Sequence, residues 1–202
     1  MSKVVVDISM SLDGYVAGPE VGPEQGLGVN GEAIHDWCVG PGRSPADEAI
    51  LAEAFERSGA VVMGRNTFDV VDGPDGWNDE MGYGADVDPT HQPPVVVVTH
   101  AVPEAVRLVE QFHFATGGVA DAVARARELC PRGKDVVVMG GASVIDQGLA
   151  AGLVDEMIVH VSPVLLGAGT RLFAAAGAVR LEQVGVLETR AATHVTYRVG
   201  PA

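Results

Sequence analysis

Three stretches of the sequence end an apolar run with small, hydroxylated or basic residues that could hold an anion. They are Gly64, Arg65, Asn66 and Thr67 in the first stretch, Thr99 and His100 in the second, and Gly140, Gly141, Ala142 and Ser143 in the third. Glycines let a phosphate approach the backbone, the N–H groups at a helix start face it, and an arginine can grip it with two donors. Each stretch alone could be ordinary turn chemistry. Because all three would lie at the carboxyl ends of parallel strands, together they predict a cradle for an elongated polyanion such as a dinucleotide.

The third of these stretches carries the fullest set of local signals. Three consecutive valines, 136–138, are β-branched and favour a strand buried on both faces. The Gly140-Gly141 pair then breaks the run. A helix is expected from Ser143, because Val144, Ile145, Leu149 and Leu153 fall on one stripe. A strand, two glycines and a helix start make an anion site, although the same order also fits a tight turn that binds nothing.

The amino-acid composition and net charge limit the classes of ligand and macromolecule that the protein could bind. The 202 residues are 47% apolar and 20% charged, which is typical of a globular protein with a substantial core. The formal net charge of −14 argues against nucleic acid or an anionic membrane as a partner, since either needs a basic face. An anionic ligand would therefore depend on backbone dipoles and a few well-placed cations. The cysteines and histidines show no metal-ligand spacing, so no metal is expected.

The chain is expected to form one domain over residues 1–202 and to lie in the cytoplasm. The sequence contains no internal repeat and no change in amino-acid composition that would mark a second domain. The N-terminal residues lack the apolar core of a signal peptide, and no apolar run approaches the ~18 residues of a membrane span.

The order of the expected elements indicates an α/β fold. Strands are predicted over residues 3–10, 60–63, 95–99, 111–116, 135–139, 155–161, 180–187 and 191–199, and helices over 44–58 and 119–130. Alternation of strand and helix in the first two-thirds implies a mostly parallel central sheet with helices on both faces. The run of strands at the end implies antiparallel pairing there. Residues 18–42 are rich in Gly and Pro and are expected to form a long loop.

Several motifs resemble known reductases. Gly64-Arg65-Asn66-Thr67-Phe68 after a strand resembles the Gly-Arg-x-Thr-Trp/Phe segment of dihydrofolate reductases, and Gly140-Gly141 before a helix is similar to the Gly-Gly of that family. Ser11-Leu12-Asp13-Gly14 and Pro163-x-Leu165-Leu166-Gly167 resemble the reductase domain of the bifunctional riboflavin-biosynthesis deaminase–reductase. The resemblance covers essentially the whole chain, with the elements in the same order.

This resemblance implies a dihydrofolate-reductase-like fold and an NADPH-dependent reductase that passes a hydride to a small pterin- or pyrimidine-like heterocycle. It implies that Arg65 faces the 2′-phosphate and Thr67 the pyrophosphate. Thr99 and His100 would lie by the adenosine ribose and its phosphate. Residues 140–145, Val144 and Ile145 included, would cover the pyrophosphate and the nicotinamide ribose, and Val16 and Ala17 would lie beside the nicotinamide.

The chain also departs from the riboflavin reductases. Met139 stands where that family typically has a glutamate that contacts the substrate, the arginines that hold the ribose phosphate have no clear match after Thr67, and the zinc deaminase half is absent. Two alternatives therefore stay open. One is the 5-amino-6-(5-phosphoribosylamino)uracil reductase of riboflavin biosynthesis itself, and the other is a non-catalytic dinucleotide-binding protein. A deazaflavin in place of NADPH is a further possibility.

Asp47 is the candidate catalytic acid, because dihydrofolate reductases carry one carboxylate on their first helix. The competing interpretation is structural, since Ser44-x-x-Asp47 has capping-box spacing at the start of the 44–58 helix. Trp37, Phe68 and Trp77 could line a substrate pocket or cover an edge of the core. A homodimer is expected through the C-terminal strands, which offer an apolar edge that otherwise needs protection.

Overall fold

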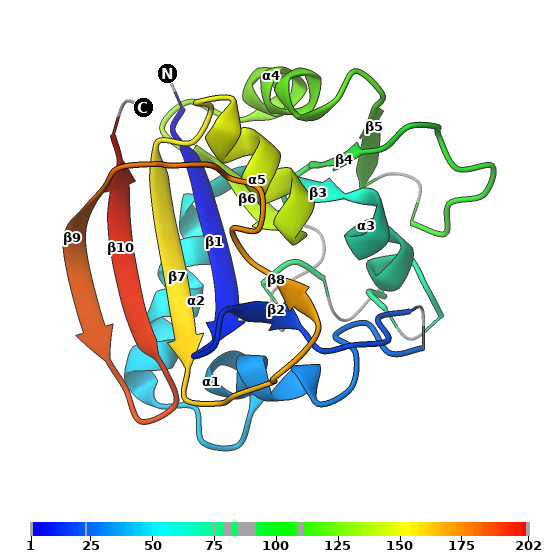
Figure 1. The fold of residues 1–202 in the computed structure, drawn as a ribbon. Coiled ribbons are helices and arrows are strands. Elements are labelled where there is room, and N and C mark those ends of the chain that lie inside the picture. The colour runs from blue at the N-terminus through cyan, green and yellow to red at the C-terminus, as the bar shows by residue number, and fades with distance from the viewer. Residues whose placement is uncertain are drawn as a thin grey trace.

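A computed structural model describes residues 2–22, 24–74, 76–78, 82–84, 92–108 and 111–200. Its centre is an eight-stranded sheet (Figure 1). From edge to edge the strands are β5 (Phe112–Ala115), β4 (Val95–Val98), β3 (Ser58–Gly64), β6 (Asp135–Gly140), β1 (Val4–Ser11), β7 (Glu156–Ser162), β10 (Thr193–Val199) and β9 (Leu181–Glu188).

Strand directions confirm the predicted mixed sheet. The six strands from β5 to β7 pair in parallel. β10 then runs antiparallel to both β7 and β9. A separate two-stranded sheet joins β2 (Tyr15–Ala17) to β8 (Thr170–Arg171). The expected fold class is therefore correct, including the antiparallel C-terminal strands.

Helices cover both faces of the sheet (Figure 1). On one face lie α4 (Val119–Leu129) and α5 (Ala142–Ala150), and on the other lies α2 (Pro45–Arg57). The shorter helices are η1 (Gly31–His35), α1 (Asp36–Val39) and α3 (Arg65–Val71). Among the described helices, none combines the length and hydropathy that a membrane crossing requires.

Side-chain alternation along the strands builds two cores. Even-numbered valines of β1, β3 and β6 pack with α4 and α5, whereas Val61 and Met63 of β3 pack with Phe68 of α3. The α2 side of β1, β7 and β10 is different, because several of its buried residues are polar. They are Ser9, Ser11, His160, Ser162 and His194. This polar interior lies between the sheet and the start of α2.

The first turn of α2 forms as the sequence predicts. Ser44 has extended backbone angles, its side chain accepts a hydrogen bond from the Asp47 amide, and Pro45 is the first helical residue. Proline suits that position because its missing N–H would have no intrahelical partner. The structure ends the helix at Arg57, one residue earlier than predicted.

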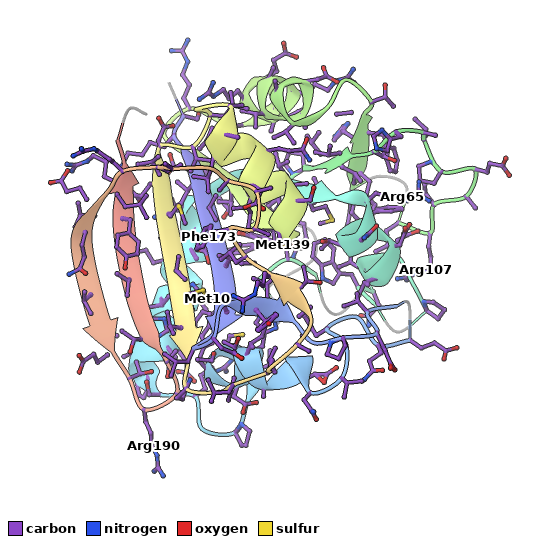
Figure 2. All side chains as sticks on the ribbon, in the orientation of Figure 1. Met10, Arg65, Arg107, Met139, Phe173 and Arg190 are labelled. Carbon is purple, nitrogen blue, oxygen red and sulfur yellow. The ribbon has the colours of Figure 1, made fainter. Side chains whose placement is uncertain are left out.

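Arg107 holds the end of α3 in place. Its backbone N–H donates to the Asp72 carboxylate, and its guanidinium donates to the carbonyls of Asp72, Gly73 and Trp77. Figure 2 shows Arg107 and Arg65 on the same side of the molecule. Because several of these donors are ionised, the hydrogen bonds are of the stronger, charge-assisted kind. They fix the helix whose first residue is Arg65.

Candidate functional site

The three predicted strand ends meet at one edge of the sheet. β4, β3 and β6 are parallel neighbours, with Gly64 opposite Val98 and Met63 opposite Gly140. The segments that follow these strands are therefore side by side. This arrangement confirms that the residues proposed as a cradle come together.

Gly64 allows β3 and α5 to pack closely together. A Cβ at this position would lie 3.0 Å from Val144 Cγ2 and 3.6 Å from the Gly141 nitrogen. The first distance is shorter than ordinary van der Waals contact, so a side chain here would push β3 away from α5. Gly64 therefore has a packing role, and its predicted role at a ligand stays a prediction.

Of the Gly140-Gly141 pair, Gly140 is buried and Gly141 is partly exposed. Gly140 has φ +137°, which favours glycine, and the peptide bond between the two residues is cis. A Cβ on Gly141 would meet the Thr67 hydroxyl at 3.5 Å, so Gly141 and Thr67 face each other. Gly141 is the N-cap of α5 and provides no side-chain cap. The first N–H groups of α5 are therefore available to an anion beside the Thr67 hydroxyl.

Three residues predicted at this site have buried side chains. Ala142, Val144 and Ile145 are 7%, 5% and 0% exposed, and their side chains pack in the core under α5. Ser143 is exposed. The Val144 and Ile145 amides already donate to the Gly141 carbonyl, at 3.0 Å and 3.3 Å. A ligand at this edge could therefore meet the Ala142 and Ser143 amides and the Ser143 side chain, and the predicted roles of Val144 and Ile145 stay predictions.

Arg65 connects the first and second strand ends. Its Nε donates to Asp69 Oδ1 at 2.7 Å, and its Nη1 lies 3.5 Å from Thr99 Oγ1. The Thr99 hydroxyl itself donates to the Ala101 carbonyl at 2.8 Å, so its proton is already engaged. Asn66 and His100 are exposed. Since 40% of the Arg65 side chain is exposed, its guanidinium can meet an anion from solvent.

Val16 and Ala17 are almost buried, at 8% exposure each. They lie in β2, and Val16 packs in the same core cluster as α5. The loop that follows reaches α3, because a Cβ on Gly26 would lie 2.5 Å from Val70 Cγ1. This segment therefore supplies an apolar, water-excluding border rather than hydrogen bonds.

Asp47 cannot touch a substrate in this arrangement. It is 0% exposed. Its Oδ2 accepts from the Ser44 amide at 2.7 Å and the Ser44 hydroxyl at 2.6 Å, and its Oδ1 pairs with His194 Nε2 at 3.1 Å. The capping-box interpretation is confirmed, and the expectation of a catalytic acid is corrected because both oxygens are occupied by protein. Burial raises the pKa of Asp47, but the hydrogen bonds from Ser44, Thr189 and His194 outweigh it and lower that pKa overall.

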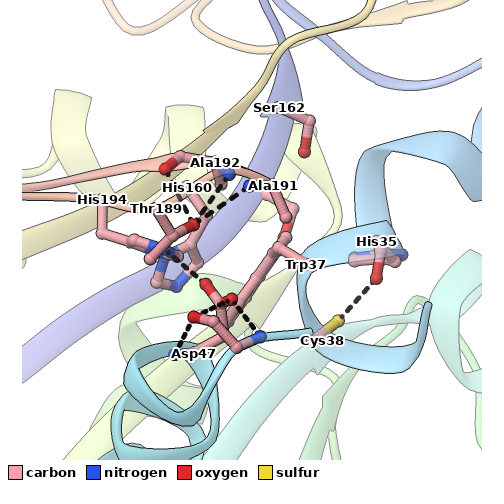
Figure 3. Close-up of polar contacts among 12 residues, drawn as sticks. His35, Trp37, Cys38, Asp47, His160, Ser162, Thr189, Ala191, Ala192 and His194 are labelled. Atoms are coloured by element: carbon pink, nitrogen blue, oxygen red, sulfur yellow. Dashed lines mark hydrogen bonds and ion pairs between the residues drawn. The ribbon is translucent and has the colours of Figure 1, made fainter. Parts of the chain in front are cut away.

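Sequence reasoning missed a histidine pair beside Asp47 (Figure 3). His194 Nδ1 lies 2.7 Å from His160 Nδ1, and His160 Nε2 lies 2.9 Å from Asp7 Oδ1. Trp37 covers the pair, with its ring centroid 4.2 Å from that of His160, and its Nε1 donates to Ser9. Trp37 and Phe68 are thus part of the interior, not the lining of a pocket. Alternation of polar residues in β1 and β7 was the available signal.

Two hollows lie away from the strand ends. One of about 350 Å³ separates α2 from the C-terminal strands and is lined in part by Asp7, Glu53, Arg57, Glu156 and His194. Another of about 140 Å³, on the opposite face, is lined by apolar residues that include Met10, Phe173 and Tyr197. Within the described ranges, no three His, Cys, Asp or Glu side chains converge as a metal site would require.

Comparison with known proteins agrees with this architecture. A Bacillus subtilis (strain 168) protein, YyaP, is 25% identical over 177 residues, which is 85% of this chain and 80% of YyaP. A putative riboflavin biosynthesis protein from Shewanella sp. PV-4 superposes with a TM-score of 0.69 at 23% identity, over 98% of this chain and 99% of that one. Dihydrofolate reductase from Enterococcus faecalis, complexed with NADP(H), gives 0.60 at 16% identity, over 98% and 97%. The fold is therefore dihydrofolate-reductase-like.

The family model is more specific than these superpositions. The model of the RibD C-terminal domain matches residues 2–195, which includes all three strand ends and the polar interior. The resemblance inferred from the sequence motifs is confirmed, and this chain belongs to the RibD C-terminal domain family.

Proposed function

We propose that this protein is a reductase that binds NADPH across the ends of β4, β3 and β6 and directs its hydride to a small planar heterocycle. The observation that carries the proposal is the meeting of an exposed arginine, Arg65, with the uncapped start of α5 at one sheet edge. A cation and free N–H groups at adjacent strand ends match a ligand with phosphates along its length.

The residues present fit such a cofactor. Among the described residues, a Cβ on Gly141 would meet the Thr67 hydroxyl alone, at 3.5 Å, so a pyrophosphate could approach where a Cβ would stand in another residue. The amides at the start of α5 and the Thr67 hydroxyl would hold it. Arg65 would hold the 2′-phosphate by exchanging its ion pair with Asp69, and Val16 and Ala17 would exclude water from the nicotinamide. When bound, the nicotinamide supplies the hydride.

The relatives support the same class of reaction. One structure with this fold is a dihydrofolate reductase complexed with NADP(H), and another is named as a putative riboflavin biosynthesis protein. We further propose that the chain works as one domain, because the central sheet takes strands from Val4 to Val199.

The substrate is proposed to be a neutral heterocycle. Met139 lies one residue before the end of β6, and it packs against the apolar cluster around Met63 and Phe68. It offers no carboxylate to a polar substrate. Family membership keeps 5-amino-6-(5-phosphoribosylamino)uracil as the second candidate substrate. Complementation of a strain that lacks only that reductase separates the two, and Met139 predicts no growth.

Turnover with a labelled cofactor tests the proposal. NADPH carrying deuterium at the transferred position is incubated with the protein and a panel of pterins, pyrimidines and flavins. A reduced product that gains one deuterium supports the reductase. Tight NADPH binding with no labelled product from any acceptor would favour a non-catalytic dinucleotide-binding protein instead.

We also propose that two copies associate through the C-terminal strands. β9 is an edge strand, and its Leu181, Val184, Val186 and Leu187 are between 41% and 49% exposed. An exposed apolar edge next to an apolar hollow favours association. Sedimentation velocity of the native protein and of a Val186→Lys variant should show a dimer and a monomer. A native monomer at all concentrations would contradict the proposal.

A further inference from the structure

Four titratable side chains from four elements form one hydrogen-bonded chain beneath α2, and Figure 3 labels Asp47, His194 and His160 among them. Asp47 of α2 pairs with His194 of β10 at 3.1 Å. His194 pairs with His160 of β7 at 2.7 Å through the two Nδ1 atoms. His160 pairs with Asp7 of β1 at 2.9 Å. Both histidines are at least 95% buried, since their exposures are 1% and 5%. We call these four residues the proton chain.

The number of protons in this chain follows from its geometry. Each of its three hydrogen bonds needs one proton between the two heavy atoms. Two neutral imidazoles and two carboxylates together supply only two protons. One of the three short contacts would then set two lone pairs against each other in a buried site, which is costly. The three distances are satisfied together when the chain holds three protons.

The position of the third proton follows from the surroundings. Asp7 is 17% exposed, and Arg57 Nη2 lies 4.0 Å from its Oδ2, which favours the carboxylate. Asp47 is held as a carboxylate by the two Ser44 donors. The third proton is therefore shared by the two facing rings, His160 and His194, across their Nδ1 atoms.

We propose that the His160–His194 pair carries one extra proton at neutral pH, so that one of the two rings is a buried imidazolium, and that this shared proton ties α2 to the sheet. Formal charge agrees with this assignment. The pair lies between two carboxylates, Asp7 and Asp47, and the neighbouring Arg57 is shared among Asp7, Asp135 and Glu156. Buried charges are tolerated when they are paired in this way. The Trp37 ring, 4.2 Å from the His160 ring, adds an aromatic surface over the pair.

Other titratable and charged groups face the proton chain from each neighbouring element. They are His35 of η1, Cys38 of α1, Glu53 and Arg57 of α2, Glu156 of β7, and Tyr83. Burial and then the His160 charge lower the pKa of His35 to about 4, so His35 adds no second cation. Asp7 borders the hollow that Glu53 and Glu156 line, so solvent protons reach the chain from that end.

Loss of the third proton would change the structure at one defined contact. The two Nδ1 lone pairs would then face each other at 2.7 Å and repel. The His194 ring would move away from His160 or lose its contact with Asp47. Asp47 also caps α2, so that movement would loosen the first turn of the helix and the packing of Trp37. The proton chain is therefore a pH-sensitive connection between α2 and three strands.

Long-range ¹H–¹⁵N NMR of the histidine rings in the full chain at pH 7.5 tests the assignment directly. We expect one imidazolium and one neutral ring, protonated at Nε2, in the His160–His194 pair. The exposed His113 of β5 serves as a reference ring. Two neutral rings in the pair would overturn the proposal. This measurement needs no variant and so does not depend on a substitution that could unfold the protein.

Two variants extend the test. Asp7→Asn keeps an acceptor for His160 but removes the negative charge, so the imidazolium signal of the His160–His194 pair should be lost at pH 7.5 from most molecules. An unchanged imidazolium would contradict the role of Asp7. In a Trp77→Phe variant, Trp37 is the remaining tryptophan. Its emission should change at the alkaline pH where the imidazolium signal disappears, and constant emission across that change would disprove the connection to α2.

Discussion

The edge formed by the ends of β4, β3 and β6 and the polar interior under α2 use opposite means to hold charge. At the edge, small residues expose backbone N–H groups, and Arg65 keeps 40% of its side chain exposed. In the interior, Asp47 and His194 are buried and each finds its partner within the protein. The N–H groups and the guanidinium at the edge can still take up hydrogen bonds from a ligand, whereas the polar groups of the interior are already paired within the protein. The difference separates a binding role from a structural one.

The largest effect is expected from removing Asp47, if the interior is structural. Asp47→Ala should lower the free energy of unfolding by ~3–5 kcal/mol, because it leaves a buried histidine and the α2 cap without their acceptor. Urea denaturation measures the loss. Glu48→Ala is the matched control, since Glu48 is also in the first turn but 57% exposed, and should cost less than ~1 kcal/mol. Equal losses in the two variants would contradict the structural role.

A smaller loss of stability is expected from adding a side chain at Gly64, at the edge formed by the strand ends. Gly64→Ala places a Cβ 3.0 Å from Val144 Cγ2 and should destabilise the fold by ~1–3 kcal/mol. Val144→Ala should cost less in the Gly64→Ala background than in the native protein, because it removes the clashing methyl. Gly22→Ala is the control, since a Cβ there has no neighbour within 4 Å among the described residues. Purely additive losses would show that the two residues do not pack as described.

Removing the Arg65 guanidinium should affect binding more than stability. Arg65→Ala is expected to weaken NADPH binding at least tenfold, about 1.4 kcal/mol, and to leave NADH binding unchanged. Arg125→Ala is a close control, because Arg125 also pairs with an aspartate one helical turn away, at 3.0 Å, but on α4. Calorimetric titration of the three proteins checks this. If the native preference for NADPH survives Arg65→Ala, the assigned role of Arg65 is wrong.

The smallest effect on the stability of the polar interior is expected from a change of pH. Asp47 has a lowered pKa, so its stabilisation is present above its unfolded value of 3.8 and is lost as pH falls through the lower folded value. His194 has a lowered pKa, so the unfolded chain gains a proton below pH 6.5 that the folded chain resists. The proposed extra proton of the His160–His194 pair opposes this effect above about pH 6.5, where the unfolded rings are mostly neutral, so the unfolding free energy should decline from about pH 6 to about pH 3. His194→Gln should flatten the part of the decline between about pH 6.5 and 5, and an already flat native profile would contradict the account.

The edge could be predicted from the sequence because its signals are local. Glycine, Arg65 and Thr67 directly follow a buried strand, and parallel strands bring such segments to one side. The first turn of α2 was readable for the same reason, from Ser44, Pro45 and Asp47. Local signals could not show that Gly64 meets Val144, since that contact depends on the packing of β3 against α5.

The polar interior could not be predicted, because its members meet through sheet register. Ser9 lies opposite His160, and His160 lies opposite His194, across three strands far apart in the chain. Polar residues that alternate along a strand usually indicate a solvated face. Here α2 and Trp37 cover that face, so the alternation marks a buried one. Nothing in the spacing of Asp47 from Ser44 shows that a histidine of the last strand pairs with the same carboxylate.

Titration of the purified protein with NADPH and with NADH, followed by nucleotide fluorescence, tests the central claim most directly. The account predicts micromolar binding of NADPH and weaker binding of NADH, because Arg65 can pair with the extra 2′-phosphate. A deazaflavin is included as a third titrant. If neither nicotinamide nucleotide binds, the cradle at the ends of β4, β3 and β6 is not an NADPH site, and binding of the deazaflavin alone would assign the edge to that cofactor.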